Sequence, residues 1–314
     1  MTAGKVIPDL LLRTPVVDAA RRALSLRLER LRDVLGPATK SFDDEGTAVH
    51  DLRVACRRAT AAVELFEVCL PKSVFKHARR RLKRYRRAAG EARDQDVWMA
   101  ELGRRLQTAP AADCPGIDFL LGICLSERIP AQLRIEAVCS GDPFEYERWM
   151  SDLIGSLVSP RPDRRVADFV RDRLLPQSER FWQAARRPSP SWGELHETRI
   201  EAKRLRYGIE LLANALHAES CSRIVAELSA AQEILGAVND GRVGRERLQG
   251  LAARLPDLAG RHWSRWSLVF EQMIAEAGVT LDTGRARFEA WRLSAREDRF
   301  DERVRTLFSG STEA

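Results

Sequence analysis

Two stretches of the chain each place a histidine ahead of a row of cations. The first row consists of His50, Arg53, Arg57 and Arg58, and the second consists of His196, Arg199, Lys203, Arg204 and Arg206. His50, Arg53 and Arg57 stand at i, i+3 and i+7, as do His196, Arg199 and Lys203, with Arg206 extending the second row. Residues with this spacing lie on one face of a helix, about 5 Å apart. Such a row suits an extended anion with regularly spaced negative charge. Arginine offers a bidentate fork to phosphate, lysine a point charge, and histidine a donor whose charge depends on pH.

The two rows belong to a longer internal repeat with an offset of 146 residues. The shared residues outside the rows are Glu64, Leu65, Leu70, Leu82, Gly90, Asp94 and Val97 in the first copy, and Glu210, Leu211, Leu216, Leu228, Gly236, Asp240 and Val243 in the second. This ungapped self-similarity indicates a tandem duplication. A weaker match upstream, at an offset of 150 residues, pairs Asp18 with Asp168. We predict halves at residues 12–158 and 162–308, with termini at 1–11 and 309–314.

Apolar residues recur at helical spacing almost throughout, and no stretch shows the alternation of a strand. Helical stripes in the first half run through residues 16–35, 52–66, 75–106 and 117–138. We expect the first helix to end at Gly36-Pro37 and the third to bend at Gly90. Each cation row lies opposite the apolar stripe of its own helix, so core packing does not account for it. The pattern predicts an all-α fold of paired helical bundles, with four long helices in each half.

Acidic residues accompany both rows: Glu64 and Asp94 in the first copy, and Glu210 and Asp240 in the second. The glutamates lie two turns beyond Arg57 and Lys203, and we expect them to orient those cations by ion pairing. The aspartates follow the glycines at which the helices are expected to bend. They could cap the next helix, pair with a motif arginine, or hold a cation beside bound phosphates.

The charge of the chain favours a polyanionic partner. The formal net charge is +7, and nine cations with no acid lie between Lys72 and Arg87. Like charges at i,i+4 destabilise a helix by a few tenths of a kcal/mol per pair, so this run indicates an external counter-charge. Lys83, Arg84 and Arg87 of this run are further candidate ligands.

Several classes of protein are disfavoured by what the sequence lacks. No stretch is long and apolar enough for a spanning helix, and the N-terminus does not resemble a signal peptide, so we expect a cytoplasmic protein without membrane attachment. Metal-ligand spacings, a P-loop and a Gly-rich phosphate cradle are all missing. We therefore expect no metal, no cofactor and no catalysis, although His50 or His196 acting in a phosphotransferase or hydrolase is an alternative.

The motifs resemble those of the CHAD family, the conserved-histidine α-helical domains. The match rests on Val49-His50-Asp51-Leu52-Arg53-Val54 with Arg57-Arg58, on Leu195-His196-Glu197-Thr198-Arg199 with Lys203-Arg204-Leu205-Arg206-Tyr207, and on Gly90-x-x-Arg93-Asp94 and Leu235-Gly236-x-x-Asn239-Asp240. The resemblance covers residues 12 to 308 and identifies the chain as a stand-alone member. It implies two four-helix bundles related by a pseudo-twofold axis, with histidines and cations around a central cavity. It also implies binding of inorganic polyphosphate and recruitment to polyphosphate granules, where granule-associated proteins are potential partners.

The ligands carried over by this resemblance are the nine residues of the two rows, with Tyr207 in a supporting role. The first copy departs from the second where Thr60 and Ala61 replace Arg206 and Tyr207. Lys83, Arg84 and Arg87 could compensate for that loss. Sequence-independent nucleic-acid binding is the first alternative, weakened by the scarcity of aromatic platforms beside the rows. A helical scaffold for an acidic protein partner is another.

Overall fold

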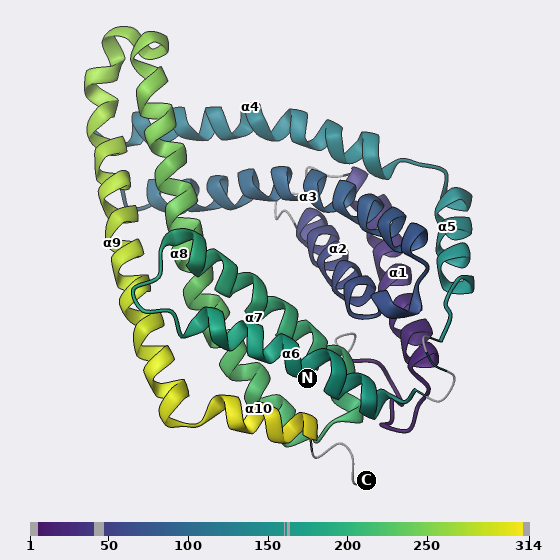
Figure 1. Cartoon of the computed structure of the whole chain (residues 1–314). Helices are drawn as coiled ribbons and strands as arrows, with labels where there is room; N and C mark the ends of the chain where they lie inside the picture. The colour runs from purple at the N-terminus through teal and green to yellow at the C-terminus, as the bar shows by residue number, and fades with distance from the viewer. Residues whose placement is uncertain (1–5, 41–46, 160, 162–163, 310–314) are drawn as a thin grey trace.

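The protein is described from a computed structural model that places residues 6–40, 47–159, 161 and 164–309. Within these residues there are ten α-helices, and the only extended pairing is one isolated bridge. The first half contributes α1 (Val16–Lys40), α2 (Thr47–Leu65), α3 (Lys72–Leu106), α4 (Cys114–Cys139) and α5 (Pro143–Gly155). The second half contributes α6 (Val166–Ala185), α7 (Trp192–Leu212), α8 (Ala218–Ala259), α9 (Trp263–Glu297) and α10 (Phe300–Ser309). The predicted all-α fold is confirmed, and each half has one short helix in addition to its four long ones (Figure 1).

The repeat in the sequence corresponds to a repeat of helices in the structure. α1 begins at Val16 and α6 at Val166, which matches the upstream offset of 150 residues. A short 3-10 helix follows each motif helix, at Glu67–Cys69 and at Ala213–Ala215, and these two are separated by the 146 residues of the main offset. The two copies therefore fold alike through their first three long helices.

The helix end expected at Gly36-Pro37 is absent, and the helix is continuous at Gly90, where a bend was expected. α1 continues through Pro37 to Lys40, because a proline so close to the end of a helix disrupts only its last turn. α3 runs through Gly90 without a break, with buried Ala89 and Ala92 on either side. An isolated glycine costs a helix only about 1 kcal/mol, and burial of these neighbours offsets that cost. The expectation that the helix ends at Gly36-Pro37 was wrong.

One hydrophobic core joins the two halves. It contains buried residues of α1, α2 and α3 together with residues of α6, α7 and α8. The rings of Phe66 and Phe169, one from each half, stack with centroids 5.1 Å apart. The segments before α1 and α6 also pair in antiparallel fashion, as Val166 N donates to Thr14 O at 2.9 Å. The halves are thus connected near the start of each.

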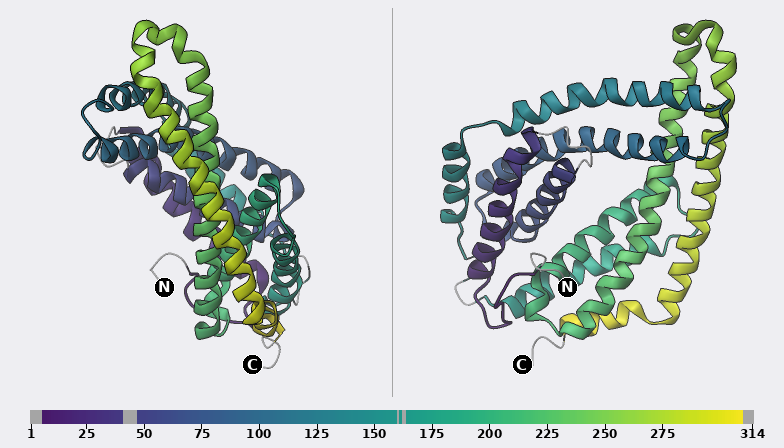
Figure 2. Two further views of the ribbon diagram at one scale, coloured as in Figure 1. Left: turned by 90° about the vertical axis from the view of Figure 1, so that its left-hand side faces the viewer. Right: turned by 180° about the vertical axis from the view of Figure 1, so that it is seen from behind.

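A second, smaller core forms where two long hairpins cross. The far ends of α3 and α4 pack against α8 and α9 through buried residues that include Leu102, Leu120 and Phe270. Figures 1 and 2 show this crossing, with the tip of the α8–α9 hairpin extending past α4. Near the crossing, the buried guanidinium of Arg128 pairs with Asp96 at 2.6 Å. None of the helices that the structure describes is long and apolar enough to cross a membrane.

Candidate anion-binding site

The motif helices α2 and α7 pack against each other and bring the two cation rows together. Each is also flanked by the helix that follows it, α3 or α8. Lys203 of α7 lies within electrostatic reach of Arg199 on its own helix and of Arg57 and Arg53 on α2. We call these four cations, Arg53, Arg57, Arg199 and Lys203, the central cluster. The predicted convergence of both rows is therefore present for their middle positions.

The central cluster holds its charges at an energetic cost. Burial and the neighbouring cations lower the pKa of Lys203 to about 8, and burial is the main cause of a lowered pKa at Arg199. The Nε atoms of Arg57 and Arg199 are buried and have no hydrogen-bond partner among the described residues. Desolvated cations without partners destabilise a fold, and a bound anion would relieve that cost.

The motif aspartates supply part of the counter-charge. Asp94 on α3 accepts a hydrogen bond from Arg53 at 2.9 Å. Asp240 on α8 partly counteracts the lowering of the pKa at Arg199 and at Lys203. Of the roles left open by the sequence, ion pairing is confirmed for Asp94. Capping is wrong for both aspartates, because α3 and α8 continue past them and no helix begins there.

The histidines stand at the start of each row, and each meets a residue of the following helix. His196 Nδ1 lies 3.2 Å from Asn239 Oδ1. Burial removes water from around His50 and lowers its pKa below the ordinary value. The nearby cation Arg93 lowers that pKa further. Arg93 and Asn239 occupy equivalent positions of the repeat, 43 residues beyond their histidines. That constant separation was a signal available in the sequence, but these two partners were not predicted as site residues.

Tyr207 connects the cluster to the end of the second row. The guanidinium carbon of Arg206 lies 5.0 Å from the centre of the Tyr207 ring, and that of Arg57 lies 5.6 Å away. Both contacts are cation–π interactions, and the one from Arg57 links α2 to α7. Arg206 also donates to Ser229 at 3.1 Å and lies 3.7 Å from Glu210. Tyr207 therefore contacts one arginine of each motif helix.

The motif glutamates pair with other cations than we expected. Glu64 Oε1 lies 3.4 Å from Arg79 Nε of α3, and Glu210 contacts the arginine one turn before it on α7. The predicted ion pairs to Arg57 and Lys203 were wrong. The guanidinium of Arg57 instead lies over the ring of Tyr207 on α7.

The adjacent cations of the rows lie apart from the central cluster. Arg58 faces Arg27, a buried arginine of α1 whose pKa is lowered to about 10 by burial and then by Arg58, with Glu210 acting in the opposite direction. Arg204 is exposed and pairs with Glu201 of its own helix. Arg27 was missed by sequence reasoning, and the signal was an arginine inside the apolar stripe of α1.

The three candidate ligands of the cation run lie on the exposed side of α3. Lys83, Arg84 and Arg87 are all exposed, and Arg87 lies 3.2 Å from Glu91 one turn later. In the repeat, Lys83 of α3 is equivalent to Ser229 of α8, and Ser229 accepts a hydrogen bond from Arg206. They flank the motif helix rather than joining the central cluster.

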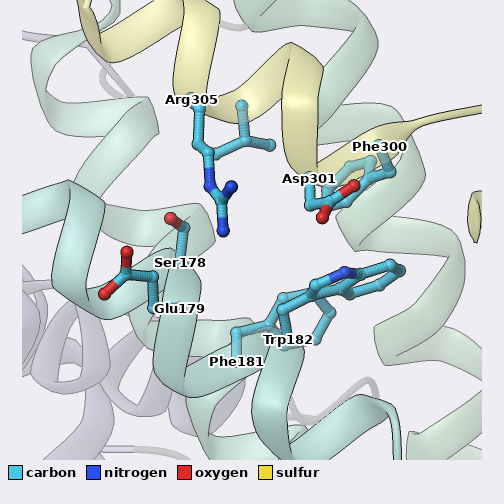
Figure 3. A pocket seen from close by; sticks show the side chains of 8 residues that line it. Ser178, Glu179, Phe181, Trp182, Phe300, Asp301 and Arg305 are labelled. Atoms are coloured by element: carbon cyan, nitrogen blue, oxygen red, sulfur yellow. The ribbon is translucent and has the colours of Figure 1, made fainter.

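Two hollows lie away from the central cluster. One, between α6 and α10, is lined by Phe181, Trp182 and Phe300, with Asp301 at its edge (Figure 3). A larger one is bounded by Leu12, the start of α8 and α10. Neither of these two hollows is lined by a residue of the two rows.

Comparison with known proteins identifies the family. A sequence profile of the CHAD domain matches residues 22–249, more than half of the chain, and the protein belongs to this family. Its fold is similar to the crystal structure of the CHAD domain from the plant Ricinus communis, with a TM-score of 0.71 and 23% identity over 90% of this chain and 95% of that one. It is also similar to PptA from Streptomyces chartreusis, with a TM-score of 0.68 and 16% identity over 88% and 99% of the two chains. A search of curated protein sequences gave no match.

Proposed function

We propose that the protein binds inorganic polyphosphate at the central cluster and does so without chemical turnover. The observation that carries this proposal is the pair of buried Nε atoms, one from Arg57 and one from Arg199, that lack hydrogen-bond partners among the described residues. They come from the two halves of the repeat and lie in one electrostatic neighbourhood. A phosphate chain supplies acceptors to both, and its charge favours protonated Lys203.

A polymer fits this arrangement better than a single phosphate. The central cluster takes two cations from each motif helix, and the two stand one helical turn apart, at about 5 Å along the axis. For the four cations of the central cluster, the carboxylates that interact with them come from the helices that follow the motif helices, Asp94 of α3 and Asp240 of α8. This leaves more cations than acids, so one anion with several charges can contact both rows at once.

The surroundings of the histidines favour binding over catalysis. His196 lies against the amide of Asn239, and His50 lies near the cation Arg93. A catalytic histidine usually has a carboxylate to orient it or a nucleophile within hydrogen-bond reach. Affinity for a long polymer would also concentrate the protein on polyphosphate granules, which is the cellular location we propose.

The direct test is a titration of the purified protein with long-chain polyphosphate at about 150 mM salt, where exposed charge pairs are strongly screened. RNA is added as a competitor, because its phosphates offer the same contacts without the polyphosphate backbone. Binding that excess RNA does not displace is expected. Weak binding, or binding that RNA removes equally well, would contradict the proposal and favour a general basic surface.

The central cluster is tested by a double charge reversal, Arg53→Glu with Arg199→Glu. Each lost charge-assisted contact is worth about 1.5–3 kcal/mol, so affinity for polyphosphate should fall about 100-fold or more. The control reverses the same number of charges on exposed arginines outside the rows, Arg21→Glu with Arg104→Glu. Equal losses from both variants would show that binding depends on overall charge and not on this site.

A further inference from the structure

The run of cations at the start of α3 forms a stripe along one face of the helix. The stripe consists of Lys72, Lys76, Arg80, Lys83 and Arg87, and Asp94 continues it. Steps of three, four or seven residues return to nearly the same side of an α-helix. All five cations are exposed. We call this set the α3 stripe.

The stripe begins at the edge of the central cluster. Asp94 lies on the same face and pairs with Arg53, which fixes this side of α3 beside the first cation row. In the second copy, the equivalent of Lys83 is Ser229, and it contacts Arg206 of the motif helix. From Asp94 to Lys72 the face extends for about 33 Å at 1.5 Å per residue. The stripe therefore leads from the cluster to the N-terminal end of α3, at Lys72.

The charges of the stripe are poorly compensated within the protein. Arg87 pairs with Glu91, whereas Lys72, Lys76, Arg80 and Lys83 form no ion pair with any residue that the structure describes. Neighbouring cations at i,i+4 repel each other on a helix. An extended anion lying along this face would remove the repulsion.

The second half has no counterpart to the stripe. The equivalent residues of α8 are Ala218, Ser222, Ala226, Ser229 and Glu233. The repeat therefore preserves the cluster in both halves but places this exposed line of cations on one side only. A purely structural need of the fold would apply to both copies, and the absence from α8 shows that the fold does not require the stripe.

We propose that the α3 stripe is a one-sided extension of the anion site, which binds the portion of a polyphosphate chain that projects beyond the central cluster. This inference rests on the proposed function and adds that the affinity depends on the length of the polyphosphate chain. Short chains are held by the cluster alone. Long chains leave it over the first half and gain further contacts along α3, so the complex is asymmetric although the fold is repeated.

The test replaces the stripe with the residues of α8. The variant carries Lys72→Ala, Lys76→Ser, Arg80→Ala and Lys83→Ser. The matched control removes four exposed arginines of the second half that form no ion pair with described residues, through Arg245→Ala, Arg265→Ala, Arg287→Ala and Arg296→Ala. Affinity for tripolyphosphate and for long-chain polyphosphate is measured at several salt concentrations, with circular dichroism to verify helicity.

The stripe variant should bind tripolyphosphate like the unmodified protein and lose about tenfold or more in affinity for the long chain. The slope of log affinity for the long chain against log salt concentration should become less negative by about 3, at about 0.7 for each of the four lost phosphate contacts. Equal long-chain losses in the stripe variant and the control would overturn the inference, as would equal losses for both probes. Displacement of the long chain from the stripe by RNA would also overturn it. Failure of the unmodified protein to bind either probe would instead refute the proposed function.

Discussion

Each cation of the central cluster would be more stable with a nearby anion than without one. Lys203 shows this most clearly, because its pKa falls to about 8 through burial and through three arginines in reach. Asp240 compensates only in part. A lysine in this position can report on binding, since its protonation and the presence of an anion are linked.

Polyphosphate affinity should fall as the pH rises from about 7 to about 9.5. The free protein loses the proton of Lys203 above its pKa of about 8, whereas bound phosphate raises that pKa, so binding takes up a proton in this range. Loss of one charged contact corresponds to about a tenfold drop. In Lys203→Arg the charge persists and the affinity should stay nearly constant over the same range. A parallel decline in both proteins would contradict this assignment.

Replacing Lys203 with an apolar residue should stabilise the free protein. Lys203→Met removes a poorly paired, partly buried charge while keeping the length of the side chain, and we expect a gain of about 1 kcal/mol in the free energy of unfolding near pH 7. The same change at exposed Lys76 should have little effect. Denaturant unfolding without ligand measures both. A loss of stability in Lys203→Met would show that Asp240 fully compensates the charge.

At the scale of elements, the stability of the fold depends on how closely the long helices approach one another. The long helices α8 and α9 pack closely at Gly284, where an added Cβ would collide with Val238 Cγ2. Val238 is β-branched and strongly prefers one rotamer in a helix, so it cannot easily turn away. Gly90, inside α3, has no atom within 4 Å of an added Cβ.

These two glycines give opposite predictions. Gly284→Ala should lower the free energy of unfolding by about 1–3 kcal/mol through overpacking. Gly90→Ala should raise it by about 0.5–1 kcal/mol, because alanine restricts the unfolded chain and fits the helix without strain. Thermal or denaturant unfolding of both variants provides the comparison. Stabilisation by Gly284→Ala would mean that α8 and α9 can separate at little cost.

At the scale of the whole molecule, the two halves share their main core, so the division at residues 12–158 and 162–308 remains a prediction about sequence and not about stability. Phe66→Ala should lower the free energy of unfolding by about 3–5 kcal/mol by removing a fully buried ring. Its partner Phe169 belongs to the other half. Hydrogen exchange should therefore show reduced protection in α1–α3 and α6–α8 together. Loss of protection confined to the first half would indicate independent domains.

The sequence by itself determined the helical class, the repeat and the residues of the two rows, because these follow from local periodicity and from spacing along one helix. Helical propensity and an apolar stripe act over a few turns, so they can be recognised without knowledge of distant contacts. For the same reason the interruption expected at Pro37 failed, since its outcome depended on the length of helix left beyond it.

Only the tertiary structure decided which cations meet. Arg57 and Arg58 are neighbours in sequence, yet Arg57 joins the central cluster and Arg58 faces Arg27 of α1. Glu64 could reach a cation of its own helix or one of α3, and the packing of α2 against α3 selected Arg79. Charge interactions act over several ångströms in every direction and depend on burial, so the partner and the pKa of each group are properties of the packed molecule.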